Sequence, residues 1–254
     1  MPLPTFASLS ASSGAMLALL ISAHVLSDFL FQSERVATGK ESRTGPLLEH
    51  GVAVFATHLV VLAPFASVEL TAWLFGLCVL HTAQDAARSR AFGERGRTLG
   101  AFAADQALHL GFAVALWAIL ASRGVDEQVV SPAVGPWLPW IGRAALVVAG
   151  FVFNLRGGST IVQRTLERFP TACPDGDPGD QYRMGRVIGY LERALVYALI
   201  LNGQWGALGL VIAAKSVARF PELKTKAFAD YYLIGTLASM VVAVGVGLAV
   251  RLVI

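Results

Sequence analysis

Three segments of the chain carry a histidine and an aspartate four positions apart. These pairs are His24 with Asp28, His81 with Asp85, and, in the reverse order, Asp105 with His109. Residues four apart lie one turn apart on the same face of an α-helix, so each pair directs an imidazole and a carboxylate toward a common point. Imidazole nitrogen and carboxylate oxygen together suit zinc, iron or manganese. The spacing therefore predicts two metal ligands from each of three helices, with a divalent metal, zinc first, as the cofactor.

All five histidines lie within the first 109 residues, and two of them stand outside these pairs. We expect His50 beside the pairs as an outer contact, together with the amides of Gln32 and Gln106. We interpret His58, two turns deeper, as a structural or lumen-facing residue. Six ionisable groups on three membrane helices are costly unless they are paired, solvated or bound to metal. A metal-free hydrogen-bonded or proton-relay cluster and unrelated structural roles remain open beside the metal site.

The helices that carry these residues are predicted to span a membrane. The chain of 254 residues is 55% hydrophobic and only 15% charged, with a mean hydropathy of +0.61, which excludes most soluble enzymes. Apolar segments long enough for a spanning helix lie at approximately 14–32, 48–66, 68–86, 100–121, 138–155, 185–202, 205–219 and 230–252. We expect an all-α polytopic bundle of about eight helices. It divides into 1–121 with the His/Asp cluster, 122–184 with the fifth helix and a cytoplasmic loop, and 185–254 with three helices.

Lys and Arg residues predict the orientation of these helices. Of the 20, 15 fall in the loops after the first, third, fifth and seventh spans, against Arg123 and Arg251 on the other side. Basic loops stay in the cytoplasm, so both termini are expected outside. The net charge of +3 then reflects topology, and no nucleic-acid partner is expected. This alternation also places the three His/Asp pairs at one depth, in the cytoplasmic third of the bilayer. The start of the loop after the fifth span, 159–169, is amphipathic and is expected on the inner membrane surface.

The second half of the chain carries charges inside two predicted spans. We expect Glu192 and Lys215 to form a structural ion pair that fastens their helical hairpin. The alternative is a basic pocket for an anionic lipid or a phosphate-bearing substrate, formed by Arg186, Arg193, Lys215 and Arg219.

Several stretches resemble a known family. They are HVLSDFLFQSERVATGK (24–40), the His50 region, HTAQDAARSR (81–90) and FAADQALHL (102–110), and they are similar to the bacterial membrane proteins of domain-of-unknown-function family 3307. Segments 185–220 and 231–239 resemble the second half of longer members, so the resemblance leaves out mainly the 122–180 region. Arg88 stands where a Lys-containing ending is typical of the family. The resemblance implies a multi-pass protein of the bacterial inner membrane and supplies no activity.

Three functional classes follow from these features. The leading hypothesis is a membrane metalloenzyme that hydrolyses a lipid-linked or membrane-delivered substrate from the cytoplasmic face, with a free carboxylate among Asp28, Asp85 and Asp105 as the base. A proton- or ion-coupled transporter that uses the cluster as a relay is the second class, and a non-catalytic membrane scaffold is the third. The expected partners are the lipid bilayer and an anionic lipid or lipid-linked substrate. A homo-oligomer is compatible with the composition.

Overall fold

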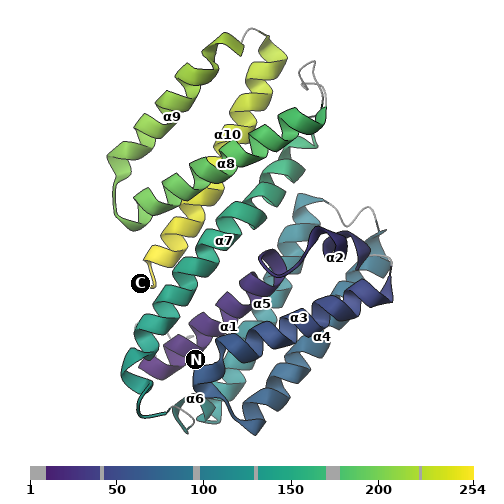
Figure 1. Cartoon of the computed structure of the whole chain (residues 1–254), viewed down its shortest axis with the longest axis vertical. Coiled ribbons are helices and arrows are strands. Elements are labelled where there is room, and N and C mark those ends of the chain that lie inside the picture. The colour runs from purple at the N-terminus through teal and green to yellow at the C-terminus, as the bar shows by residue number, and fades with distance from the viewer. Residues whose placement is uncertain (1–9, 41–42, 94–97, 129–130, 170–177, 223–224) are drawn as a thin grey trace. The chain divides into compact units, whose positions relative to one another are not determined.

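The computed structural model describes residues 10–40, 43–93, 98–128, 131–169, 178–222 and 225–254, and no strand occurs in these ranges. The α-helices in this part of the chain are α1 (Ala11–Phe29), α2 (Glu34–Gly39), α3 (Thr44–Val61), α4 (Val68–Phe92), α5 (Leu99–Ser122), α6 (Val125–Gln128), α7 (Leu138–Leu166), α8 (Pro178–Leu201), α9 (Trp205–Arg219) and α10 (Lys226–Arg251). The expected all-α bundle is confirmed (Figure 1).

Each of the eight predicted apolar segments forms one of the eight longest helices: α1, α3, α4, α5, α7, α8, α9 and α10. Four helical stretches are long and apolar enough to cross a membrane, namely α1, α5, Gly135–Leu166 and α10. These four indicate a membrane protein. The eight crossings and the outward placement of both termini stay predictions.

One predicted boundary is wrong. The fifth span was expected to end at residue 155, followed by a separate amphipathic segment over 159–169, but α7 continues without a break to Leu166. The apolar positions Ile161, Val162 and Leu166 keep the helical period, and no proline interrupts it. The predicted loop therefore begins a full three turns later than expected. Residues 170–177 lie outside the described part of the chain.

The chain forms two compact units, Met1–Ala149 and Gly150–Ile254. In the first unit, α1 packs against α3 and α5, and α4 packs against the same two helices, which gives a four-helix bundle (Figure 1). One half of this bundle is filled by an apolar core whose largest members include Met16, Leu20, Phe65, Leu74 and Leu120. On α1, α4 and α5 the His/Asp pairs lie beyond the core residues along each helix, so the cluster occupies the other half of the bundle.

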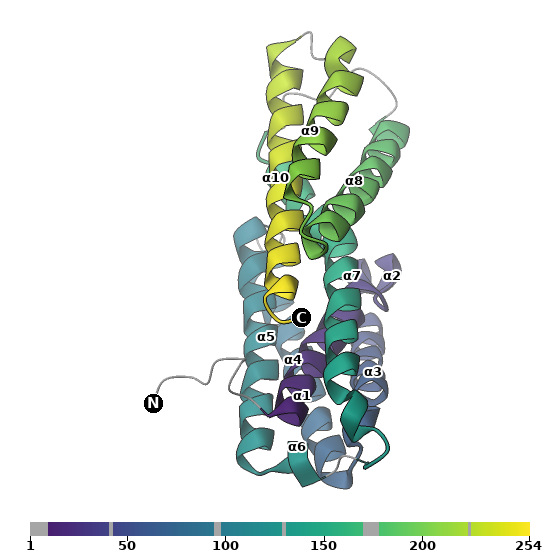
Figure 2. The same cartoon turned by 90° about the vertical axis from the view of Figure 1, so that its left-hand side faces the viewer.

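In the second unit, α8 packs against α10 and α9 (Figure 2). Glycines allow the closest approaches in this unit. A Cβ added at Gly247 of α10 would lie 2.8 Å from Cγ2 of Ile200 on α8. A Cβ at Gly150 of α7 would lie 2.5 Å from the hydroxyl of Tyr197, also on α8. The missing side chains therefore let α8 contact both α7 and α10, with Val196, Ile200 and Ala243 in the core.

Short hydroxyl side chains fix where the helices of the cluster begin. Ser67 accepts a hydrogen bond from the amide of Leu70 at 3.0 Å, and Thr98 accepts one from the amide of Ala101 at 3.2 Å. Such N-caps satisfy amides that the first turn leaves without a partner. They begin α4 and α5 at defined residues, upstream of the His/Asp pair that each helix carries.

Candidate metal centre

The structure brings the side chains of all three His/Asp pairs into one connected cluster. Ligand atoms lie within 4.8 Å of one another in three overlapping groups, which are His24, Asp28 and His81; His50, His81 and Asp85; and Asp85, Asp105 and His109. All seven side chains are almost completely buried. Four helices, α1, α3, α4 and α5, therefore contribute to a single polar interior.

The tightest part of the cluster consists of Asp28, His50, His81 and Asp85, which we call the carboxylate–histidine centre. The Nε2 atoms of His50 and His81 lie 3.1 Å apart. Oδ1 of Asp28 is 3.4 Å from each of these nitrogens. Oδ2 of Asp85 is 3.5 Å from the His50 nitrogen and 3.8 Å from that of His81. Ligands held by one zinc ion at about 2.0–2.2 Å lie about 3.3–3.6 Å apart in a tetrahedral shell. Three of the five distances lie in that range, and the other two, 3.1 and 3.8 Å, lie 0.2 Å outside it.

His50 thus differs from its expected place. It was assigned as an outer contact, but its Nε2 atom makes the shortest contact between two candidate ligands in the centre. The reason is that α3 lies against both α1 and α4, so that its first turns face the two His/Asp pairs on those helices. Hydropathy predicts that His50 lies near the start of an apolar helix but not which way its side chain points.

Lys40 lies directly at the centre, which the sequence reasoning did not predict. Its Nζ atom is 2.6 Å from Oδ2 of Asp85, and both side chains are buried. The Gln32 amide, with its oxygen turned toward Lys40, accepts from Nζ at 2.9 Å and donates to the backbone carbonyl of Asp28 at 3.2 Å. The six-residue helix α2 positions this lysine, since Lys40 is its C-cap. Gln32 therefore links Lys40 to α1.

A second cation, Arg88, compensates the third aspartate. Its Nε atom is 3.2 Å from Oδ1 of Asp105, and Nε2 of Gln84 donates to the same oxygen at 3.4 Å. His109 lies further from this carboxylate, with 4.0 Å between Nδ1 and Oδ1. Charge balance is the signal that could have identified Lys40 and Arg88, because three buried aspartates need nearby cations, and Lys40 ends α2 while Arg88 lies in α4 three residues after Asp85.

The amide of Gln106 contacts the centre from α5. Its Nε2 atom donates to Oδ2 of Asp28 at 3.4 Å. The other oxygen of Asp28, Oδ1, is buried and has no hydrogen-bond partner among the described residues. Hence Gln106 holds the carboxylate by one oxygen, and the other faces the imidazoles of His50 and His81. A ligating carboxylate held by an outer hydrogen bond is the usual arrangement at metal sites.

Deeper in the bundle, a small enclosed cavity of about 10 Å³ is lined by His24, His58, His81 and His109 and by three apolar side chains. A cavity of this size holds about one water-sized group. His58, which we expect to be structural or lumen-facing, is one of the residues that line this cavity. In the sequence, His58 lies two turns beyond His50 and one turn from the apolar core. This position does not show which side chains of the other helices it contacts.

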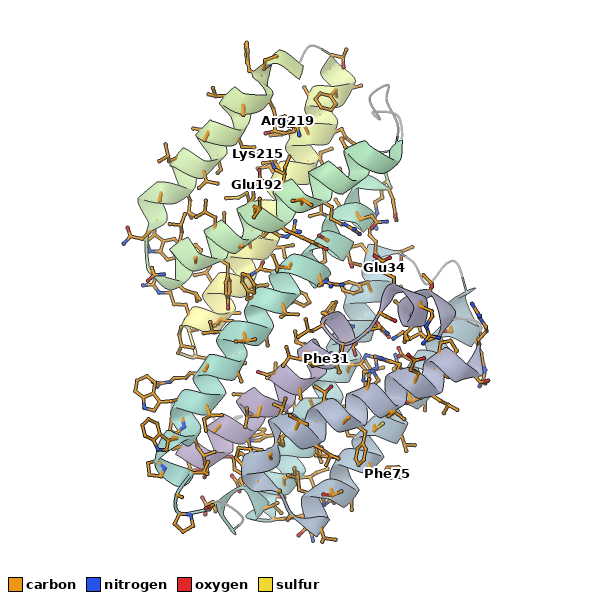
Figure 3. The ribbon with its side chains drawn as sticks, viewed as in Figure 1. Phe31, Glu34, Phe75, Glu192, Lys215 and Arg219 are labelled. Atoms are coloured by element: carbon orange, nitrogen blue, oxygen red, sulfur yellow. The ribbon has the colours of Figure 1, made fainter. Side chains whose placement is uncertain are left out.

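In the second unit, Lys215 on α9 and Glu192 on α8 form the ion pair that their positions predict, with 2.5 Å between Nζ and Oε2 (Figure 3). Arg193 does not join them. Its guanidinium is buried and donates to the carbonyls of Asn154 and Leu155 at 2.7 and 3.3 Å. It also donates to the hydroxyls of Ser159 and Ser239 at 2.6 and 3.1 Å.

The expected basic pocket of Arg186, Arg193, Lys215 and Arg219 is therefore not assembled as a set. Lys215 is bound to Glu192, and Arg193 is engaged with α7 and α10 inside the unit. Arg186 is exposed on α8, and Arg219 lies one turn beyond Lys215 on α9 (Figure 3). Two of the four cations thus have internal partners of their own.

Comparison with known proteins identifies the first half of the chain. Residues 16–133 match the family described as Protein of unknown function (DUF3307). The C-terminal segments 185–220 and 231–239 lie outside the matched region. No curated protein and no solved structure matches the chain. The matched region holds the whole His/Asp cluster together with Lys40, His58 and Arg88, and residues 16–133 of this chain are similar to the DUF3307 family.

Proposed function

We propose that the protein is an integral-membrane metalloprotein whose carboxylate–histidine centre binds a divalent transition-metal ion, with zinc as the first choice. The observation that carries this proposal is the spacing of four donors from α1, α3 and α4. Two imidazole nitrogens lie 3.1 Å apart, and both lie 3.4–3.8 Å from two carboxylate oxygens. One bound cation is a partner for all four electron-pair donors, the two imidazole nitrogens and the two carboxylate oxygens. A hydrogen bond between the two imidazoles leaves the carboxylate oxygens without that partner.

The charges of the cluster support a cation. Asp28, Asp85 and Asp105 bring three negative charges into the bundle, and Lys40 and Arg88 compensate Asp85 and Asp105. Asp28 remains, with Oδ1 buried and without a hydrogen-bond partner among the described residues. An uncompensated carboxylate inside a membrane bundle costs several kcal/mol, of the order of 2.5–3.5 on insertion scales. A divalent ion at the centre removes that cost.

The location that fits is a bacterial inner membrane, with the basic loops in the cytoplasm and both termini outside. The family resemblance supports the membrane, and the distribution of Lys and Arg supports the orientation. In this orientation the centre lies in the cytoplasmic third of the bilayer, and lipid covers the exposed apolar residues of the long helices. Lys40, at the end of α2, then faces the cytoplasmic side of the centre.

The activity that we propose is hydrolysis of a lipid-linked or membrane-delivered substrate. A bound metal ion supplies an activated water and polarises the bond to be broken. Asp105 is the carboxylate that does not belong to the four-residue centre. A carboxylate oxygen of Asp105 lies within 4.8 Å of one of Asp85. This position, close to the metal ligands but outside them, suits a general base. Transport across the membrane fits less well, because the apolar core fills the bundle beyond the histidines.

Metal analysis of the full-length protein in detergent tests the centre. After removal of bound metal and dialysis against zinc, the wild type is expected to retain metal, and His50→Ala is expected to lose the ion of the centre. Glu49→Gln is the matched control, since Glu49 is adjacent on α3, half exposed and paired with Arg35 outside the cluster. Wild-type protein that retains no zinc, or equal retention by His50→Ala, would contradict the metal centre.

The hydrolase activity needs its own test. Vesicles of phosphatidylcholine that contain phosphatidic acid offer an anionic phosphoester lipid, and release of inorganic phosphate and of fatty acid reports two kinds of hydrolysis. Zinc-loaded wild type is expected to release one of these products. Asp105→Asn is expected to keep its zinc and to lose about 100-fold or more in rate, as befits a general base. No release by the zinc-loaded wild type from these vesicles counts against the hydrolase and leaves the metal centre standing.

A further inference from the structure

The cavity beneath the carboxylate–histidine centre is lined by imidazoles whose nitrogens lack partners. The Nε2 atoms of His24, His58 and His109 are buried without a hydrogen-bond partner in the described part of the chain, and so is Nδ1 of His109. Each of these residues is only 2% exposed. Buried polar atoms are normally paired, so three imidazoles whose Nε2 atoms lack partners around one small cavity indicate a group that they bind together.

His58 shows which atom faces that group. Its Nδ1 atom lies 2.8 Å from the carbonyl oxygen of Val54, one turn earlier on α3. A carbonyl can only accept, so Nδ1 carries the proton and Nε2 carries a free electron pair. With Nδ1 turned back onto its own helix, Nε2 is directed toward the cavity that His58 lines. A backbone carbonyl that fixes the tautomer of an imidazole in this way is typical of metal-ligating histidines.

The other two rings approach from different helices. His24 on α1 and His109 on α5 have ring centroids 5.5 Å apart, and His81 lies 4.0 Å from His109 by the same measure. The remaining wall is apolar and consists of Leu77, Phe112 and Ala113. The cavity is thus bounded by imidazoles from four helices and by hydrocarbon, a setting that excludes bulk water and hydrated ions.

We infer that His24, His58 and His109 form a second metal site, separate from the carboxylate–histidine centre and made of imidazole nitrogens alone. Imidazole suits zinc, copper, nickel and iron. The lining holds no carboxylate, although Oδ1 of Asp105 lies 4.0 Å from Nδ1 of His109, so the pocket offers the ion nitrogen ligands alone. This favours an ion of low charge or one with high affinity for nitrogen, which copper(I) and zinc(II) respectively represent. The pocket takes one such ion, because its volume is about 10 Å³.

A single water molecule is the other occupant that the volume allows. A water molecule and a metal ion require different protonation states of the three imidazole rings. Water has two hydrogens to donate, so the third imidazole must present a proton to it. A metal ion accepts an electron pair from all three rings. Replacing one histidine by an apolar residue therefore removes a metal ion from the protein, whereas it changes no metal count if the cavity holds water.

The experiment measures metal per chain in the full-length protein in detergent, after equilibrium dialysis against zinc(II) and, in a separate arm, against copper(I) under reducing conditions. His58→Leu removes the ligand that faces only the pocket. Ala113→Val narrows the cavity from α5 without touching a ligand and serves as the second variant. His50→Ala disables the carboxylate–histidine centre, and Glu49→Gln is the surface control. Monodispersity and helical content of each variant are measured alongside.

The expected result in at least one arm is about two ions per chain in the wild type and in Glu49→Gln, and about one in His58→Leu, Ala113→Val and His50→Ala. X-ray absorption of the ion left in His50→Ala is expected to show nitrogen neighbours only. About one ion in the wild type, unchanged in His58→Leu and lost in His50→Ala, overturns the pocket and leaves the proposed centre intact. If the wild type holds about one ion, and His58→Leu loses this ion while His50→Ala keeps it, the pocket is supported and the carboxylate–histidine centre is contradicted.

Discussion

The Nζ atom of Lys40 lies 2.6 Å from Oδ2 of Asp85, although the two residues are 45 positions apart in the chain. The lysine comes from the end of the short helix α2, and the aspartate from the interior of α4. A cation from the protein itself is therefore in contact with a carboxylate that we propose as a metal ligand. Lys40 and a metal ion compete for the same oxygen.

Lys40→Met tests this competition. Loss of the ammonium leaves Asp85 uncompensated, so the metal-free protein is expected to lose about 3–5 kcal/mol of stability, as when one partner of a buried ion pair is removed. Zinc restores part of that loss, and its affinity is expected to rise about tenfold, equivalent to about 1.4 kcal/mol. Thermal unfolding with and without zinc measures both effects. Lys226→Met, at the exposed start of α10, is the control. Unchanged zinc affinity in Lys40→Met would show that the lysine does not compete.

Arg88 and Asp105 are expected to act as a buried pair in their own right. Their side chains are 14% and 9% exposed, so either Arg88→Gln or Asp105→Asn alone should cost about 3–5 kcal/mol of unfolding free energy. The double variant, which keeps two polar groups and removes both charges, should recover most of that loss. A double-mutant cycle by denaturant unfolding measures the coupling. If the single losses simply add in the double variant, the pair has no coupling.

The orientation of the helices can be tested at two exposed arginines. Arg35 and Arg123 pair with Glu49 and Glu69, and their side chains are 68% and 56% exposed. In a chain whose Cys78 and Cys173 are replaced by serine, Arg123→Cys is expected to react with a membrane-impermeant maleimide on intact cells, and Arg35→Cys only after permeabilisation. The reverse pattern would show that the basic loops are outside. Equal labelling of both would contradict their placement on opposite sides.

Gly247 is expected to be intolerant of even one methyl group. A Cβ at this position would lie 2.8 Å from Cγ2 of Ile200, whereas a Cβ at Gly245, on the same helix, meets nothing within 4 Å. Gly247→Ala should therefore destabilise the protein by about 1–3 kcal/mol. Gly245→Ala should be neutral or stabilising by up to about 1 kcal/mol, since alanine is the better helix former. Unfolding in detergent compares the two, and equal stabilities would contradict the close contact of α8 with α10.

Arg193 is expected to be structural. Four of its hydrogen bonds go to Asn154, Leu155, Ser159 and Ser239. Arg193→Lys keeps the charge, but an ammonium cannot reach four acceptors arranged around a planar fork. We expect the free energy of unfolding to fall by about 3 kcal/mol or more, because two or more charged hydrogen bonds are lost. The zinc content is expected not to change. Melting curves and metal analysis check the two parts, and a stable Arg193→Lys would show that charge alone is needed.

The sequence predicts the His/Asp cluster well because helical periodicity and loop charges are local properties. The four-residue spacing places each pair on one face, and the alternation of basic loops places the pairs at one depth. The same reasoning misses Lys40, and it does not show how closely His50 and His58 contact the pairs. Their roles depend on helix rotation and on the short turn of α2, and hydropathy reports neither. For Arg193, the sequence gives a charge inside a span, but its partners on α7 and α10 follow only from packing.

The apolar half of the first bundle has a consequence for how the protein acquires its metal. Met16, Leu20, Phe65, Leu74 and Leu120 fill the bundle beyond the histidines, so we expect an ion to enter and leave on the side of the centre where Lys40 lies. Loading is then a one-sided equilibrium, and the free metal concentration in a single compartment decides which ion the protein carries. The same closure means that binding moves no charge through the bundle, so metal occupancy should produce no electrical current across the membrane.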